Sequence, residues 1–234
     1  MYNIPKKSNA KKVDREHFKN MNDRLKNYTD EQLRCDHELT KIAYKYRDST
    51  DKCPSATYWR KHNYTEFYGP LLNHLRDQPI RLLEIGVRWG GSIVMWKEFF
   101  PNGEIYGVDL NFREVHAPLK KHMDWNRDDP GKGVNLIDGD AYSKSFADKH
   151  FSDIGFDVII DDGSHKTEHQ IKFFNIYRHF LSEGGYLMCE DIPSLPTAQK
   201  IINAFDGKIN NLSLIDRTHN IPSGRDEIIL LYKE

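Results

Sequence analysis

The sequence predicts an α/β fold, in which a mostly parallel sheet is covered by helices on both faces. Three observations point to it. Short apolar strands alternate with helical segments from about residue 81 onward, a glycine-rich turn follows the first strand, and acidic residues follow several of the strands. Because parallel strands need a long crossover between them, this alternation is typical of a parallel sheet with helical crossovers.

The expected strands are short apolar runs that cover residues 82–85, 104–110, 135–137, 156–160, 185–189, 213–215 and 227–232. Helices are expected between them, over residues 92–100, 167–181 and 197–205. The first helix ends where Pro101, Asn102 and Gly103 interrupt the helical spacing. The second begins at a capping box formed by Thr167 and Gln170. The seven strands are expected to form one sheet, with the helices as crossovers between them.

Residues 1–49 are expected to form a tail and a helical extension, and residues 50–234 the main domain. The first residues carry lysines without apolar partners, which is more typical of a solvated tail than of a nucleic-acid-binding arm. From residue 14 to 47 the apolar spacing is helical, with a capping box at 29–32. These helices could cap an active site or pair two subunits into a homo-oligomer, and the sequence does not choose between the two.

Composition excludes several classes of protein. The formal net charge of −1 gives no general attraction to polyanions, which disfavours a nucleic-acid partner. Cys35, Cys53 and Cys189 are far apart, which argues against a disulfide scaffold or structural zinc and suits a reducing compartment. The N-terminus has no apolar signal region, and no run of about 18 apolar residues occurs. A cytoplasmic protein without a membrane partner is therefore expected.

A glycine-rich turn, EIGVRWGGS at residues 84–92, joins the first expected strand to its helix. Glycines let the backbone turn tightly and approach a ligand, and a helix N-terminus offers free N–H groups. The turn alone is a weak signal, because such turns also serve packing and because Arg88 departs from the dinucleotide fingerprint. The candidate cofactor-binding residues of this turn are Glu84, Gly86, Arg88, Gly90 and Ser92.

Acidic residues after the second and third strands strengthen the hypothesis of a nucleoside-containing cofactor. Asp109 ends the second strand about 20 residues after the turn, where an acid accepts hydrogen bonds from ribose hydroxyls. Asp140, followed by Ala141, comes after the third strand and is placed to meet an adenine. A single such aspartate is often only a helix cap. Both lie, however, at the edge where open α/β sheets bind ligands.

Residues 81–192 resemble a class I S-adenosylmethionine-dependent methyltransferase, whose first motif has the form E/D-x-G-x-x-x-G. Glu84, Gly86 and Gly90 match that motif. Residues 50–52, 62–64 and 68 also resemble the corresponding stretch of the metal-dependent sugar O-methyltransferases of macrolide biosynthesis. The resemblance implies a Rossmann-like seven-stranded sheet that ends in an antiparallel hairpin. It also implies S-adenosyl-L-methionine as methyl donor and a hydroxyl of a small molecule, such as a sugar, as acceptor.

Acidic residues also follow the fourth and fifth strands, in DDGSH at 161–165 and EDIP at 190–193. Three carboxylates that meet at one edge repel one another unless a cation neutralises them, and oxygen ligands select Mg²⁺, Mn²⁺ or Ca²⁺ over zinc. A bound metal would help a hydroxyl to ionise at neutral pH, and His165 could take the proton as general base. The resemblance maps the metal ligands onto Asp162, Glu190 and Asp191, and the base onto His165.

Three assignments stay open. Asp161 could face the cofactor or orient a metal ligand from behind. Tyr64 belongs to an aromatic cluster over residues 58–68 that could stack on a sugar or on adenine, and packing against the main domain explains it equally well. The other histidines, His169 among them, lack partners at ligand spacing and are expected to be surface or core residues.

Rival functions keep parts of this pattern. A polynucleotide or protein methyltransferase would share the cofactor site and need a basic face, which the balanced charge does not favour. A non-catalytic binding or assembly domain is disfavoured by the intact carboxylates and His165. An NAD-dependent oxidoreductase could use Asp109 for its ribose, but the glycine spacing argues against it. The acceptor molecule itself cannot be read from the sequence.

Overall fold

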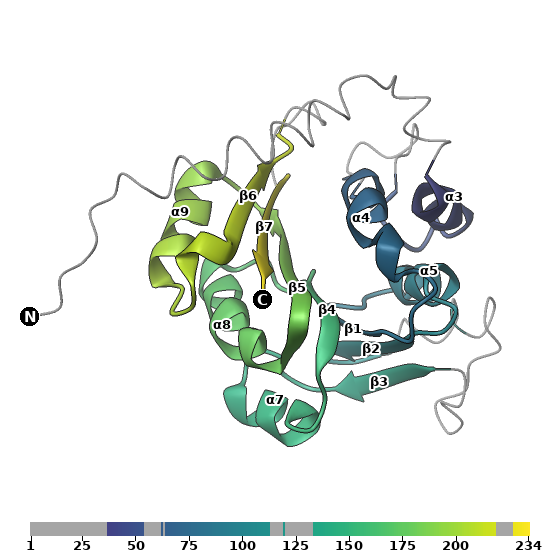
Figure 1. Cartoon of the computed structure of the whole chain (residues 1–234). Helices are drawn as coiled ribbons and strands as arrows, with labels where there is room; N and C mark the ends of the chain where they lie inside the picture. Colours follow the sequence, from purple (N-terminus) through teal and green to yellow (C-terminus); the bar gives the residue numbers. More distant parts are fainter. Residues whose placement is uncertain (1–36, 54–61, 63, 113–118, 120–132, 219–226) are drawn as a thin grey trace, which may run out of the picture.

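A seven-stranded sheet organises the computed structural model, which describes residues 37–53, 62, 64–112, 119, 133–218 and 227–234. The strand order is β3-β2-β1-β4-β5-β7-β6. Neighbouring strands from β3 to β5 are parallel, whereas β7 runs antiparallel to both β5 and β6 (Figure 1). The sequence prediction of a Rossmann-like sheet that ends in an antiparallel hairpin is confirmed.

The strands are β1 (Arg81–Ile85), β2 (Glu104–Asp109), β3 (Val134–Asp138), β4 (Phe156–Asp161), β5 (Leu181–Ile192), β6 (Leu212–Asp216) and β7 (Ile228–Lys233). The helices are α3 (Glu38–Lys45), α4 (Thr65–Leu72), α5 (Gly91–Phe99), α7 (Lys144–Phe151), α8 (Thr167–Tyr177) and α9 (Leu195–Ala204). In Figure 1, α3, α4 and α5 cover one face of the sheet, and α7, α8 and α9 cover the other.

Several boundaries differ from the sequence prediction. Helix α8 ends at Tyr177, and a 3₁₀ turn leads directly into β5, which is longer than the expected strand. The predicted capping box at Thr167 is absent: Lys166 is the N-cap and makes no side-chain cap. Helix α7 was not predicted, although its N-cap Ser143 accepts a hydrogen bond from the backbone N–H of Phe146. The helical segment expected before residue 37 lies outside the described residues.

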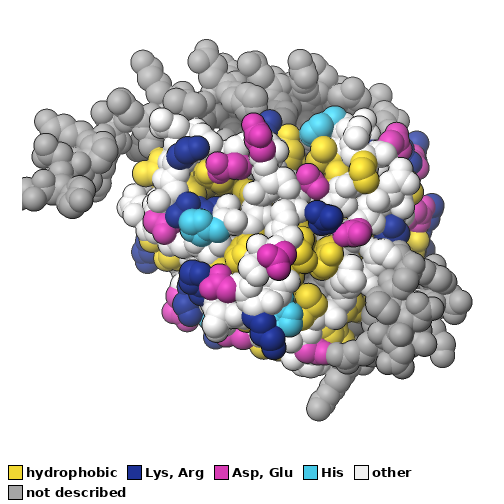
Figure 2. All heavy atoms as spheres, turned by 60° about the horizontal axis from the view of Figure 1, so that its bottom comes forward, with side chains coloured by type: hydrophobic (Ala, Val, Ile, Leu, Met, Phe, Trp, Pro, Cys, Tyr) yellow, Lys and Arg dark blue, Asp and Glu magenta, His cyan; other side chains and the backbone are white. Residues whose placement is uncertain are grey.

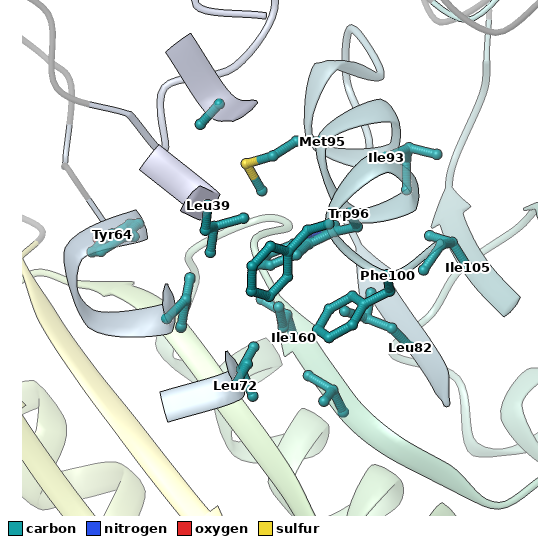
Figure 3. Close-up of a cluster of buried hydrophobic side chains, with 14 of the residues drawn as sticks. Leu39, Tyr64, Leu72, Leu82, Ile93, Met95, Trp96, Phe100, Ile105 and Ile160 are labelled. Carbon is teal, nitrogen blue, oxygen red and sulfur yellow. The ribbon is translucent and has the colours of Figure 1, made fainter. Parts of the chain in front are cut away.

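Helix α3 belongs to the hydrophobic core of the main domain. Its Leu39, Ile42 and Ala43 are almost completely buried, in the cluster that also contains Trp96 of α5 and Leu72 of α4. Figure 3 shows Leu39 facing Trp96 across this cluster. The helix contacts both α4 and α5. This part of the N-terminal extension is therefore packed as part of the domain.

The alternation of side chains along the strands decides which residues face which layer. Glu84 of β1 pairs with Ile160 of β4, and the side chains at these positions point toward α4 and α5. Ile85 pairs with Asp161, and both point to the opposite layer with α7 and α8. Successive residues of a strand point to opposite faces, so Glu84 and Asp161 lie in different layers although they are close in the sheet.

The outer surface carries charges of both signs. On the face shown in Figure 2, acidic and basic side chains are interspersed among the described residues, and no patch of one sign covers it. Among the described helices, none combines the length and the apolar character needed to cross a bilayer.

Candidate active site

A cavity of about 660 Å³ lies at the carboxyl ends of the central strands. Its wall includes the residues that follow four successive parallel strands: Gly86 after β1, Asp109 at the end of β2, Asp140 after β3 and Asp162 after β4. Residues 49–51, from the segment between α3 and α4, complete the wall. Open α/β sheets bind ligands at this edge.

The glycine turn is shaped by close backbone contacts. Gly86 has a φ of 86°, and a Cβ atom there would lie 2.1 Å from the backbone oxygen of Asp162, so only glycine fits. Gly90 has a φ of 81° and is the N-cap of α5. The guanidinium of Arg88 lies over the ring of Trp89, 4.0 Å from its centroid. The turn therefore presents backbone and a stacked side-chain pair to the cavity.

The two aspartates after β2 and β3 both hold local backbone. Oδ2 of Asp109 accepts hydrogen bonds from the N–H groups of Val87 and Arg88, each at 2.9 Å. Oδ1 of Asp140 accepts from the N–H of Tyr142 at 3.0 Å. Each carboxylate thus fixes a loop of the cavity wall with one oxygen.

The cavity wall contains six of the ten predicted cofactor-binding residues: Gly86, Arg88, Ser92, Asp109, Asp140 and Ala141. The other four do not line it. Glu84 is fully buried beneath the turn, where it accepts hydrogen bonds from the hydroxyl of Ser92 at 2.6 Å and the indole of Trp96 at 3.3 Å. Gly90 caps α5, and Tyr64 and Asp161 have the partners described below. These four shape or support the site without facing the cavity.

Asp161 lies behind the cavity because its strand position points away from Asp162. Its Oδ1 accepts hydrogen bonds from the hydroxyl of Tyr142 at 2.7 Å and the N–H of Gly163 at 3.2 Å. Burial raises its pKa to about 6, although the bond from Tyr142 opposes the shift. Tyr142 in turn accepts from the N–H of Ser164. Asp161 therefore fixes the loop that carries the candidate base.

Asp162 and His165 line the cavity, and Asp191 lies close to both without being part of the wall. Each offers one ligand atom, and these atoms all lie within 4.8 Å of one another. Nε2 of His165 is 3.6 Å from Oδ2 of Asp191. His165 and Asp191 have φ values of 56° and 54°. This left-handed conformation is strained for any residue except glycine, and such strain recurs at functional sites.

Glu190, the third predicted metal ligand, has buried hydrogen-bond partners of its own. Its Oε2 accepts from Nζ of Lys52 at 2.7 Å, and its Oε1 accepts from the hydroxyl of Tyr68 at 2.5 Å. The structure does not bring it into the group of Asp162, His165 and Asp191. The physical reason is that both oxygens of Glu190 accept hydrogen bonds, from Lys52 and Tyr68, whereas Lys52 contacts only one oxygen of Asp162.

Asp191 is held from the side of α4. Its Oδ1 accepts from the hydroxyl of Tyr64, and its backbone N–H donates to the same oxygen of Tyr64 at 3.3 Å. His62 lies 3.7 Å from Asp191 and bonds to Glu227 at 2.7 Å. Burial, together with the charge of Asp162, raises the pKa of Asp191 to about 6, while His62 opposes the shift.

Sequence reasoning missed several residues of the site. His169, expected to be a surface or core residue, lines the cavity, where it bonds to the hydroxyl of Ser164 at 2.7 Å and stacks on Tyr142. It stands five residues after Ser164, in the first turn of α8, and no ligand spacing marked this pair in the sequence. Lys52 lies in the stretch 50–52 that carries the family resemblance, but sequence reasoning assigned it no role, because its partners lie far away along the chain.

The possible ligand atoms of Asp162, His165 and Asp191 suit a hard divalent cation, because two of the three are carboxylate oxygens. Asp162 and Asp191 supply carboxylate oxygens, and the imidazole of His165 lies beside them. Mg²⁺ is usually held by one or two carboxylates together with water and substrate oxygens, so two carboxylates are a sufficient protein contribution. The residues present therefore fit such an ion.

Comparisons with known proteins agree with this geometry. A family model described as a methyltransferase domain matches residues 83–192. Among curated relatives, mycinamicin VI 2''-O-methyltransferase of Micromonospora griseorubida is 36% identical over 140 residues, which cover 56% of this chain and 32% of the relative. L-olivosyl-oleandolide 3-O-methyltransferase of Streptomyces antibioticus is 33% identical over 138 residues, with the same coverage. The match thus spans about a third of these relatives' length.

Solved structures show the same fold. The MycE methyltransferase of the mycinamycin biosynthetic pathway, in complex with Mg and SAH, has a TM-score of 0.57 and 26% identity, covering 84% of this chain and 54% of that chain. An O-methyltransferase of Bacillus cereus in complex with SAH has a TM-score of 0.54 at 13% identity, covering 93% and 97% of the two chains. At that identity the second similarity concerns the fold alone.

Proposed function

We propose, from the premise that residues 83–192 are a methyltransferase domain, that this protein transfers a methyl group from S-adenosylmethionine to a hydroxyl of a glycosylated small molecule. The names of the curated relatives support the acceptor class, because they describe O-methylation of sugar-bearing macrolides and related compounds. The cavity supports the donor, because residues of the glycine turn, Asp109 and Asp140 share its wall.

The observation that carries the proposal is the meeting of three side chains: Asp162 and His165, which line the cavity, and Asp191 beside them. An acceptor hydroxyl needs a base within hydrogen-bond reach and a group that stabilises its developing negative charge. A binding domain without chemistry would not need two carboxylates and an imidazole in one place, two of these residues in a strained backbone conformation.

Each of these residues has a role in the proposed reaction. The acceptor oxygen forms a bond to the methyl carbon as the carbon–sulfur bond breaks, and the hydroxyl proton passes to His165. Asp162 and Asp191 would hold a divalent cation, which when bound lowers the pKa of a hydroxyl near it. Because hard cations prefer oxygen ligands, the imidazole stays available for the proton. His165 is 44% exposed, so it can reach an incoming substrate.

The residues of the wall position the donor. Asp109 has one oxygen on the backbone of the turn and would offer the other to the ribose hydroxyls. Asp140 and Ala141 would border the adenine, as in the sequence prediction. Alignment of oxygen, carbon and sulfur supplies much of the acceleration, because a sulfonium methyl group is already activated.

The test is turnover with S-adenosylmethionine and a panel of glycosylated acceptors, followed as release of S-adenosylhomocysteine. Excess chelator should abolish turnover, Mg²⁺ or Mn²⁺ should restore it, and Asp162→Asn should resist that rescue. Asp148→Asn is the matched control, since Asp148 makes only an exposed ion pair with Lys144. Full activity in chelator would show that the carboxylates are structural. Failure to bind the donor at all would refute the methyl-transfer proposal.

A further inference from the structure

A buried lysine lies among the acids of the candidate site. Lys52 has no exposed surface, and its Nζ is 2.7 Å from Oδ2 of Asp162, 2.7 Å from Oε2 of Glu190 and 3.3 Å from Oε1 of Glu84. These acids lie on or just after three neighbouring strands, β1, β4 and β5. Charges taken out of water are tolerated only when they are paired and hydrogen-bonded. The ammonium of Lys52 therefore forms ion pairs with three carboxylates.

The main chain of Lys52 is fixed as firmly as its side chain. Its carbonyl oxygen accepts from the N–H of Thr65, at the start of α4, and the carbonyl of Asp51 accepts from the N–H of His62, both at 3.1 Å. Tyr68 of the same helix donates to the oxygen of Glu190 that Lys52 leaves unused. Lys52 thus belongs to a segment that precedes the methyltransferase domain match, and backbone hydrogen bonds to His62 and to the start of α4 hold that segment at the sheet edge.

We propose that Lys52 is a positioning residue of the metal site, and this rests on the metal-dependent function proposed above. Its ammonium is a resident cation that holds Glu190 and one oxygen of Asp162, and it leaves the other oxygen of Asp162 for a divalent ion beside Asp191. Lys52 and the divalent ion share Asp162. The ammonium therefore limits how tightly the site binds metal, because like charges within a few ångströms repel.

The test replaces Lys52 by methionine, which has similar length and no charge. In chelator, Lys52→Met should lower the midpoint of thermal unfolding by roughly 6–20 °C, because two buried carboxylates and the partly buried Asp162 lose their partner. Without donor or acceptor present, its affinity for Mn²⁺ should rise by about tenfold or more, because Asp162 and Glu190 are no longer neutralised. Lys144→Met removes an exposed ion pair and should change neither quantity appreciably.

A second variant keeps the test decisive if Lys52→Met does not fold. Lys52→Met/Glu190→Gln removes a charge of each sign and should unfold at a higher temperature than Lys52→Met, because only Glu84 and Asp162 are then left without the ammonium. Its Mn²⁺ affinity should return toward the wild-type value. Unchanged or weaker Mn²⁺ binding by Lys52→Met would overturn the proposal and leave Lys52 a packing residue. A double variant no more stable than Lys52→Met would also overturn it.

Failure of the metal-dependent function has a different signature. In that case the wild type would bind no Mn²⁺ and would keep full turnover in chelator. The unfolding midpoints in chelator would then still decide whether Lys52 holds the carboxylates, because that comparison involves no metal.

Discussion

At the scale of single residues, backbone strain is concentrated at the candidate active site. Among the described residues, the non-glycine positions with positive φ are Arg88, His165 and Asp191. Each such conformation costs about 1–3 kcal/mol and persists only where the surroundings impose it. Here Asp109 holds the N–H of Arg88, and the hydroxyl of Tyr64 holds Asp191 on two atoms. The surrounding contacts thus hold Arg88 and Asp191 in conformations that reduce the stability of the fold.

The role of His165 as base predicts a specific loss. His165→Gln should lower the turnover rate by roughly 10²–10⁴, because general-base catalysis contributes about that factor. Affinities for S-adenosylhomocysteine and Mn²⁺ should stay close to wild type, since the carboxylates remain. Single-turnover rates and calorimetry would measure both. A variant with the wild-type rate would show that another group takes the proton.

The role of Asp109 predicts a loss of binding rather than of rate. Asp109→Ala should weaken binding of S-adenosylhomocysteine by about 1.5–3 kcal/mol, the usual contribution of a charged hydrogen-bond partner. Part of that loss would come from the turn, whose N–H groups at Val87 and Arg88 lose their acceptor. Calorimetry with Asp148→Ala as an exposed control separates the effect from general destabilisation. Unchanged affinity would remove Asp109 from the donor site.

At the scale of elements, the segment before α4 closes the cavity. A Cβ atom on Gly91, the first residue of α5, would lie 2.3 Å from the carbonyl oxygen of Ser49. That segment therefore passes directly over the start of the helix, and residues 49–51 contribute to the cavity wall. The methyltransferase domain match begins only at residue 83, so part of the wall comes from outside it.

The close approach of Gly91 to Ser49 predicts that a methyl group added at Gly91 weakens donor binding. Gly91→Ala must displace the backbone at Ser49, because main chain cannot rotate out of the way as a side chain can. We expect a roughly tenfold weaker affinity for S-adenosylhomocysteine, equivalent to about 1.4 kcal/mol, measured by calorimetry. Gly155→Ala is the control, since its Cβ would meet only the side chain of Ser182 within 3 Å. Equal affinity in both variants would mean that the segment does not form the donor site.

At the scale of the whole molecule, two hydrophobic clusters lie on opposite faces of one sheet. The first includes residues of α3, α4 and α5, so the described part of the N-terminal extension and the sheet share a core. Tyr64 and Tyr68 belong to this first cluster, and their hydroxyls bond to the carboxylates of Asp191 and Glu190 at the sheet edge. Packing of the first layer and geometry of the site are therefore linked.

Shared packing predicts that α3 contributes to global stability. Ile42→Ala should cost about 2–5 kcal/mol of unfolding free energy, because Ile42 is 1% exposed and its removal leaves a cavity. Tyr44→Ala on the same helix is the control, since Tyr44 is 52% exposed. Denaturant unfolding should remain a single transition in both variants. A small loss for Ile42→Ala, or a separate early transition, would show that α3 is an independent appendage.

The sequence by itself determined the sheet, the edge that carries the site and most of its acids. Strand periodicity and turn residues are local patterns, so β1 to β7 and the positions of Gly86, Asp109 and Asp162 could be predicted from short windows. The alternation of side chains along β4 could also have placed Asp161 behind the cavity, away from Asp162.

Only the tertiary structure decided how the carboxylates are shared. Lys52 bonds to acids 110 and 138 residues away, and the hydroxyl of Tyr64 bonds to Asp191 across 127 residues. No local pattern encodes such pairs, because they depend on strand register and on how α4 packs on the sheet. For that reason the sequence grouped Glu190 with Asp162 and Asp191. In the folded chain both oxygens of Glu190 bond to Lys52 and Tyr68, whereas Asp162, which shares that ammonium through one oxygen, lies close to His165 and Asp191.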